Sequence, residues 1–362
     1  MGQEERRTGR VSSIPKKKLH IGGWLLGLAA AAVVVALIIR FQRSGFDWDR
    51  FAATFVRLNW PWFGASMLLA LATYFGRVLR WEVMIRPLQP NASLWRLFVA
   101  TAIGFTAVVI FGRPGELVRP YLIAVKEKIP VSSQIAAWIL ERIYDLLVVL
   151  LMFGFALTRL ESSGAKVGPA VQSVLSTGGY LVGILCSTCL IILIGLRFFS
   201  DAMLRRILAA TAFLPERPQA AVNKILTAFV SGMGSTRSGS FVALLILYTL
   251  VEWTIIVGCF YCLFQSFAAT AQLGFTDILI FVGFTAFGSI VQIPGIGGGA
   301  QVASVLVLTQ IFGIPLETAS GIALLIWFVS WLVIVPFGLI LAFHEGLNWK
   351  RLKEIEEEAA SL

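Results

Sequence analysis

The sequence predicts an all-α, polytopic membrane protein, and three observations support this class: the composition, a series of long apolar runs, and two Pro-Gly interruptions. Of the 362 residues, 57% are hydrophobic and 14% are charged, and the mean hydropathy is +0.83. Soluble domains contain about 25% charged residues. With about 20 residues for each crossing, the chain has room for about six to eight transmembrane helices and no separate soluble domain of ordinary size.

The net charge of +10 does not indicate nucleic-acid binding in a chain of this kind. The basic residues fall between apolar runs, where they orient helices and contact anionic lipid headgroups. We therefore expect membrane lipids as partners and no nucleic acid.

The amino-terminal region is predicted to be an uncleaved anchor. A basic leader at residues 1–20 precedes an apolar run at Ile21–Phe41. This run is too long for the core of a signal peptide, and Arg40-Phe41-Gln42-Arg43 offers no small-residue cleavage site. We expect a cytoplasmic leader, a single transmembrane domain at residues 21–343, and a charged cytoplasmic tail at residues 344–362.

Eight further apolar runs follow the first. They lie at Pro61–Ile85, Leu94–Phe111, Val131–Leu157, Gly178–Leu196, Phe241–Phe267, Phe275–Ile293, Val302–Ile314 and Ala319–Phe343. Residues 197–238, between the fifth and sixth spans, are predicted to be an amphipathic cytoplasmic connection, because Leu204, Ile207 and Leu208 share one helix face with Arg205 and Arg206 beside it. Docking of a partner is the alternative.

The charges of the loops predict that the Leu94–Phe111 run enters the membrane and returns. If it crossed, the basic loops Arg113–Lys128 and Arg197–Arg237 would both face outward, against the positive-inside tendency. If it is re-entrant, both loops stay cytoplasmic. The carboxy terminus is then also inside, provided that the Phe275–Ile314 region begins and ends outside. We therefore expect both termini on the cytoplasmic side of the cell membrane.

Each half of the chain contains one interrupted membrane segment. Gly112-Arg113-Pro114-Gly115 ends one apolar run, and Pro294-Gly295-Ile296-Gly297-Gly298-Gly299 ends another. Paired interruptions are typical of transporters built from inverted repeats, whose binding site lies between the broken helices. Only the hydropathy pattern supports the repeat, and a glycine-rich packing site or a tight turn is the alternative.

Charged residues within the membrane runs predict the site. Glu141, Arg142 and Asp145 share one helix face, and each centrally placed charge costs about 2.5–3.5 kcal/mol unless it is paired. The charges at the first interruption, Arg113, Glu116 and Arg119, are the expected partners. We predict that these six residues bind substrate; the alternative is an ion-pair network that only locks helices together.

Three other charged residues are secondary candidates. Arg77 and Arg80 stand one turn apart near the end of a span, where snorkelling to headgroups is at least as good an explanation as substrate contact. Glu252 lies in mid-span with no charge near it in the sequence. It is a candidate for proton coupling or for binding a headgroup amine, and burial in the neutral form is an equal alternative.

These residues carry a resemblance to the lysylphosphatidylglycerol synthase transmembrane-region family, also called flippase-like membrane proteins. The resemblance rests on Gly112-Arg113-Pro114-Gly115-Glu116 with Arg119, on Glu141-Arg142 with Asp145, and on the late Pro-Gly turn. It implies a membrane module that moves lipids or lipid-linked sugars between leaflets. Such modules occur alone or fused to a soluble aminoacyl-lipid synthase domain, which we expect this chain to lack. Similar proteins commonly carry Glu shortly after the late glycines, where this chain has Gln301, so only a hydrogen-bonding role is expected there.

The predicted function is movement of a phospholipid or a lipid-linked sugar, with its phosphate-bearing headgroup in a polar cavity between the re-entrant helices. The predicted substrate-binding residues are Arg113, Glu116, Arg119, Glu141, Arg142, Asp145, Gly297, Gly298 and Gln301. Two alternatives remain: a membrane-embedded headgroup transferase that uses Glu141 or Asp145 as a base, and a scaffold for a lipid-modifying complex. Lipid-modifying enzymes or a second copy of the chain are further candidate partners.

The four cysteines form two Cys-x-x-Cys pairs, Cys186 with Cys189 and Cys259 with Cys262. In a soluble protein this spacing would indicate zinc. Here both pairs lie in apolar spans without polar neighbours that could orient metal ligands, so we expect small buried hydrophobes and neither a metal nor a cofactor.

Overall fold

The computed structural model describes residues 45–162, 169–197, 238–289, 292–293 and 297–346, with isolated positions between 206 and 232. The chain divides into two units, Met1–Trp48 and Asp49–Leu362, and the residues discussed below belong to the second. The predicted leader and first span lie outside the described residues. So do Pro294-Gly295-Ile296, most of the 197–238 connection and nearly all of the tail.

Helices dominate the described part of the chain, and the predicted class of helical polytopic membrane protein is confirmed. The long helices are α3 (Trp60–Ile85), α4 (Leu94–Phe111), α6 (Val131–Ser162), α7 (Pro169–Arg197), α10 (Gly239–Gln265) and α13 (Leu316–His344). The shorter ones are α2 (Trp48–Val56), α5 (Val118–Glu127), α11 (Phe275–Gly288) and α12 (Gly299–Leu306). Four of them, α3, α4, α10 and α13, are long and apolar enough to cross a membrane. At 32 and 29 residues, α6 and α7 also exceed the required length.

The first interrupted segment is a helical hairpin. Helix α4 begins where the Ser93 hydroxyl accepts a hydrogen bond from the Arg96 amide, and it ends at Gly112, whose φ of 75° favours glycine. A 3-10 turn at Arg113–Leu117 then leads into α5. With 10 residues, α5 extends only about 15 Å, half of the hydrocarbon thickness of about 30 Å.

The two ends of this hairpin meet, as expected of a re-entrant segment. Arg96, in the first turn of α4, forms an ion pair with Glu127, the last residue of α5, at 2.8 Å. Glycine allows the two arms to approach closely, since a Cβ at Gly104 would lie 2.5 Å from Cβ of Arg119. The glycines of this segment therefore serve both the break and the packing.

The second interrupted segment is also a hairpin. Helix α11 ends at Gly288, and the chain forms a two-residue antiparallel ladder between β1 (Gln292–Ile293) and β2 (Gly297–Gly298) before α12 begins. The arms touch at Gly288, where a Cβ would lie 2.6 Å from Cβ of Ala303. The run predicted at Phe275–Ile293 is thus helical only as far as Gly288. The short run predicted at Val302–Ile314 is α12 together with a π-helical turn at Val307–Ile311.

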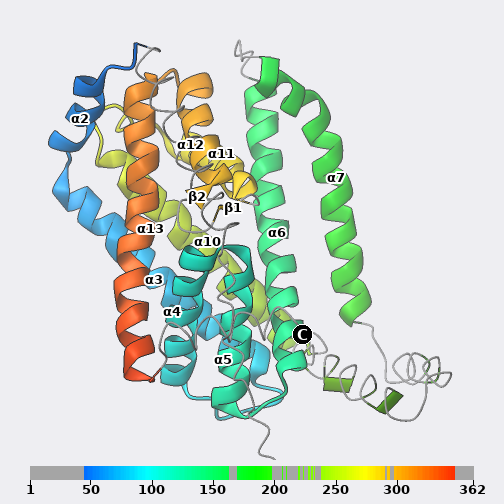
Figure 1. The fold of residues 1–362 in the computed structure, drawn as a ribbon. Helices are drawn as coiled ribbons and strands as arrows, with labels where there is room; N and C mark the ends of the chain where they lie inside the picture. The colour runs from blue at the N-terminus through cyan, green and yellow to red at the C-terminus, as the bar shows by residue number, and fades with distance from the viewer. Residues whose placement is uncertain are drawn as a thin grey trace, which may run out of the picture. The chain divides into compact units, whose positions relative to one another are not determined.

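The two halves have the same order of elements in opposite directions. Each contains a long helix, an interrupted hairpin and another long helix: α3, α4–α5 and α6 in one half, and α10, α11–α12 and α13 in the other. Helices α3 and α10 run antiparallel, because the Asn59 amide donates to the Ser266 carbonyl at one end and Arg86 lies 6.0 Å from the Phe241 ring centroid at the other. Figure 1 shows the α4–α5 hairpin and the α11–α12 hairpin entering from opposite ends.

The hairpins pack against the long helices through two apolar clusters. One cluster joins α3, α4, α5 and α6 around fully buried Trp81 and Leu140, and the other joins α10, α11 and α13 around Phe264 and Phe281. Large apolar side chains such as Ile340 remain exposed on the outward faces, as expected of helices surrounded by lipid. The polar residues described next lie between these clusters.

Candidate functional site

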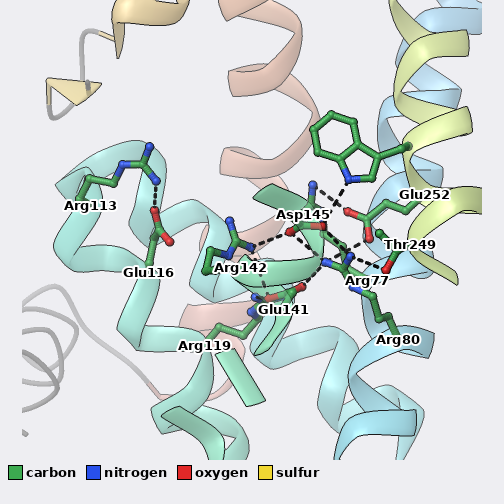
Figure 2. A network of polar contacts seen from close by, with 11 residues as sticks. Arg77, Arg80, Arg113, Glu116, Arg119, Glu141, Arg142, Asp145, Thr249 and Glu252 are labelled. Atoms are coloured by element: carbon green, nitrogen blue, oxygen red, sulfur yellow. Dashed lines mark hydrogen bonds and ion pairs between the residues drawn. The ribbon is translucent and has the colours of Figure 1, made fainter. Parts of the chain in front are cut away.

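Arg80 is the centre of the buried charge network. Its side chain has no exposed surface, and its guanidinium contacts carboxylates from two other helices: Glu141 at 2.6 Å and Asp145 at 2.7 Å, both on α6, and Glu252 on α10 at 3.3 Å. Figure 2 shows these groups pointing toward one another. The snorkelling interpretation is therefore wrong for Arg80, since its neighbours enclose it and provide the counterions that headgroups would have provided.

Glu141 connects this centre to the first hairpin. The Glu141 carboxylate is fully buried and receives hydrogen bonds from Arg80, Arg119 and Arg142. Arg119 also stacks on the Trp81 ring, with its guanidinium carbon 4.0 Å from the ring centroid. Buried charge needs both pairing and hydrogen bonding to be tolerated, and this arrangement provides both.

Arg142 and Arg77 lie on the outer side of the network. Arg77 pairs with Glu252 at 3.0 Å, and 16% of its side chain is exposed. Arg142 reaches Glu141 at 3.3 Å and Asp145 at 3.5 Å, and 35% of its side chain is exposed. Within the described residues, the buried Nε of Arg142 has no hydrogen-bond partner.

Arg113 and Glu116 form a separate pair at the tip of the first hairpin (Figure 2). Arg113 also donates to the backbone carbonyl of Ser289, at the end of α11, at 2.5 Å. The tips of the two hairpins therefore touch through this hydrogen bond between a side chain and the backbone.

Residues of the late glycine turn cap the start of helix α12. The Gly298 amide donates to Oε1 of Gln301 at 2.6 Å, which fixes the start of α12. Gly297 belongs to β2 and pairs with Ile293. Gln301 thus accepts a hydrogen bond within the turn, and its role in binding substrate stays a prediction.

A cavity of about 390 Å³ lies between the hairpin tips and the long helices. Five charged residues line it, namely Arg77, Arg113, Glu116, Arg119 and Arg142, and so do Gly298 and Gln301. The described lining does not include Arg80, Glu141, Asp145, Glu252 or Gly297. The structure thus divides the predicted residues into a lining that is rich in arginine and a second group, mostly carboxylates, behind it.

Several polar and aromatic neighbours were not predicted from the sequence. Thr249 accepts a hydrogen bond from Arg80 at 3.3 Å, and Nε1 of Trp253 donates to Asp145 at 3.4 Å. Trp138, Trp327 and Trp331 line the cavity. Thr249 lies three residues before Glu252 on the same helix face, so that spacing could have indicated it. The tryptophans give no such signal, because aromatic residues are common throughout these helices.

The cysteines take no part in the charge network. All four are free, and the Cys259 thiol donates to the Ser66 carbonyl of α3 at 3.2 Å. In the described part of the chain, no group of three or more His, Cys, Asp or Glu side chains is placed to hold a metal ion.

Comparison with known proteins gives one match. Neither the curated proteins nor the solved structures contain a match to the chain. A family model described as the lysylphosphatidylglycerol synthase TM region matches residues 24–338. This range includes both hairpins and every charged residue of the network. Because the match covers well over half of the chain, the protein belongs to the lysylphosphatidylglycerol synthase TM region family, whose members are membrane proteins involved in lipid handling.

Proposed function

We propose that this protein moves a lipid with a phosphate-bearing headgroup between the leaflets of the cell membrane, holding the headgroup in the cavity between the hairpin tips. The observation that carries the proposal is the lining of that cavity, which contains four arginines and one glutamate. Arginine binds phosphate through two parallel hydrogen bonds. A positively charged cavity within a membrane domain is therefore suited to a lipid phosphate, and the acyl chains stay in the surrounding lipid.

The arrangement of the hairpins supports a transport cycle. The hairpins enter from opposite ends, and their tips lie beside the cavity. In transporters with inverted repeats, rocking of one half against the other opens a central site to each side in turn. Here such a motion would separate the Arg113 side chain from the Ser289 carbonyl.

The same geometry favours transport over headgroup transfer. A general base needs a carboxylate that can reach the substrate. Glu141 and Asp145 are each held by arginines and are not part of the described lining. Glu116 does line the cavity, but it is paired with Arg113.

The proposal is tested by reconstitution. Purified protein is placed in vesicles that contain an acyl-labelled fluorescent phosphatidylglycerol, and a membrane-impermeant quencher reports the fraction in the outer leaflet over time. We expect Arg113→Ala to slow exchange about ten- to hundredfold, because a hydrogen bond to a charged group contributes about 1.5–3 kcal/mol. Its free energy of unfolding should fall by about 1 kcal/mol, since 43% of the Arg113 side chain is exposed.

Arg86→Ala is the matched control, because Arg86 is also paired with a carboxylate within its own segment and does not line the cavity. It should leave exchange unchanged. Normal exchange in a folded Arg113→Ala protein would contradict the proposal. Chemical analysis of the recovered lipid decides between transport and transfer, since a transferase would alter the headgroup.

The orientation is a second prediction. We propose that the end of the domain where Lys126 pairs with Glu345 is cytoplasmic. In a background with the native cysteines replaced, an impermeant maleimide applied from outside should label Gln272→Cys, in the exposed loop between α10 and α11, and should not label Lys128→Cys. The opposite labelling pattern would reverse the orientation.

A further inference from the structure

The buried network contains one more positive charge than negative charges. Its ion pairs connect the four arginines at positions 77, 80, 119 and 142 with three carboxylates, Glu141, Asp145 and Glu252. The separate pair of Arg113 and Glu116 is neutral. A single uncompensated charge in a membrane domain is costly, and the usual remedy is a partner of opposite sign.

This count is made on the described residues. The residues that the structure leaves undescribed between Ser289 and Gly297 are Ile290, Val291 and Pro294-Gly295-Ile296, and none of them is ionisable. Among the described residues, the network therefore has an excess of one positive charge.

The contact distances indicate which arginine is least closely held by the carboxylates, and it is Arg142. Arg80 approaches Glu141 and Asp145 to 2.6 and 2.7 Å, whereas Arg142 lies 3.3 and 3.5 Å from the same two carboxylates. Arg119 is also held closely by Glu141. Arg142 is thus the arginine without a carboxylate of its own, and it lines the cavity with a buried Nε that has no partner in the described residues.

The carboxylates show which headgroups would be disfavoured. Each carboxylate at the site, including Glu116 on the cavity wall, already contacts at least one arginine. An ammonium group entering the cavity would find no free carboxylate among the described residues and would lie close to Arg77, Arg113, Arg119 and Arg142. A phosphodiester would find Arg142, whose two carboxylates are held more closely by Arg80.

We propose that the cavity selects lipids whose headgroup carries a single net negative charge, in the form of a phosphodiester with an uncharged hydroxyl-bearing remainder, and that Arg142 binds this phosphate. The inference rests on the proposed function and narrows its substrate class. Lipids with an ammonium group, including aminoacyl esters of phosphatidylglycerol, should be bound more weakly, because their amine is repelled by the same arginines. Polyprenol and diacylglycerol carriers are equally compatible, since the selection acts on the headgroup.

The test measures binding and exchange separately. Short-chain dihexanoyl phosphatidylglycerol and phosphatidylethanolamine are titrated against the detergent-solubilised protein, with thermal stabilisation as the measure of binding. The acyl-labelled forms of both lipids are compared in the vesicle assay. We expect the wild type to bind phosphatidylglycerol about tenfold more tightly, as one favourable charge-assisted contact would give. In Arg142→Gln, the affinities for phosphatidylglycerol and phosphatidylethanolamine should become similar. In Arg142→Lys, part of the preference for phosphatidylglycerol should return.

Arg96→Gln is the control, because it removes one positive charge from an arginine that pairs with Glu127 and does not line the cavity. The preference for phosphatidylglycerol should survive in this variant.

A second variant acts in the opposite direction: Glu116→Gln adds one net positive charge to the cavity and should raise the affinity for dihexanoyl phosphatidic acid, which carries more negative charge. If folded Glu116→Gln protein binds dihexanoyl phosphatidic acid no more tightly than the wild type, the charge argument is overturned. This holds whether or not Arg142→Gln loses the preference for phosphatidylglycerol.

The outcomes separate the two proposals. Equal binding of phosphatidylglycerol and phosphatidylethanolamine by a wild-type protein that exchanges lipids would overturn the selectivity and leave transport standing. Selective binding that depends on Arg142, without any exchange above that of empty vesicles, would overturn transport and leave the binding site standing. A preference that persists in Arg142→Gln would show that another residue binds the phosphate.

Discussion

Replacing Arg80 by methionine is expected to prevent the protein from accumulating in the membrane. Methionine has a similar length but no charge, and it would leave Glu141, Asp145 and Glu252 without their shared cation. Breaking a buried ion pair by removing one partner costs about 3–5 kcal/mol, and Arg80 has three partners. Abundance in isolated membranes and thermal unfolding in detergent would both measure the loss.

Arg86→Met provides the comparison, because Arg86 pairs with Glu82 at 2.5 Å while 40% of its side chain is exposed. Exposed pairs contribute about 0–1 kcal/mol, so this variant should behave almost like the wild type. Adding Asp145→Asn to Arg80→Met should recover part of the stability, since Asp145 loses its closest arginine and retains only Arg142, at 3.5 Å. Similar abundance of Arg80→Met and Arg86→Met would show that the network does not stabilise the fold.

Replacing Gly115 by alanine is expected to disrupt the first hairpin. A Cβ at this position would lie 2.5 Å from the Ala107 carbonyl carbon and 2.7 Å from the Val108 amide nitrogen, so the added methyl group would meet backbone rather than a side chain that can move. Overpacking costs about 1–3 kcal/mol where side chains can adjust, and we expect at least the upper part of that range here. Thermal unfolding would measure the change, and the lipid-exchange rate should fall with it.

Gly64→Ala is the matched control on α3, because no atom lies within 4 Å of the Cβ that it would add. Alanine is favoured over glycine in helices by about 1 kcal/mol, so this variant should be neutral or slightly more stable. If Gly115→Ala unfolds at the same temperature as Gly64→Ala, the close contact between α4 and the hairpin turn is not required.

The apolar runs were sufficient to predict most of the helices. The run at Leu94–Phe111 has the same bounds as α4, because Ser93 caps its start and Gly112 ends it. The run at Phe275–Ile293 could not be divided from hydropathy alone. Residues Ser289 to Ile293 include three apolar side chains, so the hydrophobic pattern of the sequence continues past the end of the helix. Helix α11 ends at Gly288, where its backbone lies close to α12, a contact between two segments of the chain that hydropathy does not report.

Sequence reasoning identified the charged residues of the site but not their division into lining and support. An arginine near a helix end can snorkel or be buried, and the sequence around Arg80 does not distinguish the two outcomes. The decision depends on Glu141 and Asp145, which lie 61 and 65 residues away. Glu252 has no charge near it in the sequence, and its partners Arg77 and Arg80 come from the antiparallel helix α3.

The hydrogen bond between Arg113 and the Ser289 carbonyl has a consequence for the energy barrier to lipid movement. A charged group that crosses a bare bilayer meets a hydrocarbon layer of about 30 Å. Hairpins that enter from opposite ends and touch at their tips bring polar backbone toward the middle from both sides. Under the proposed function, the height of the barrier is set where the two tips meet, and membrane thickness should affect the rate much less than changes at that contact.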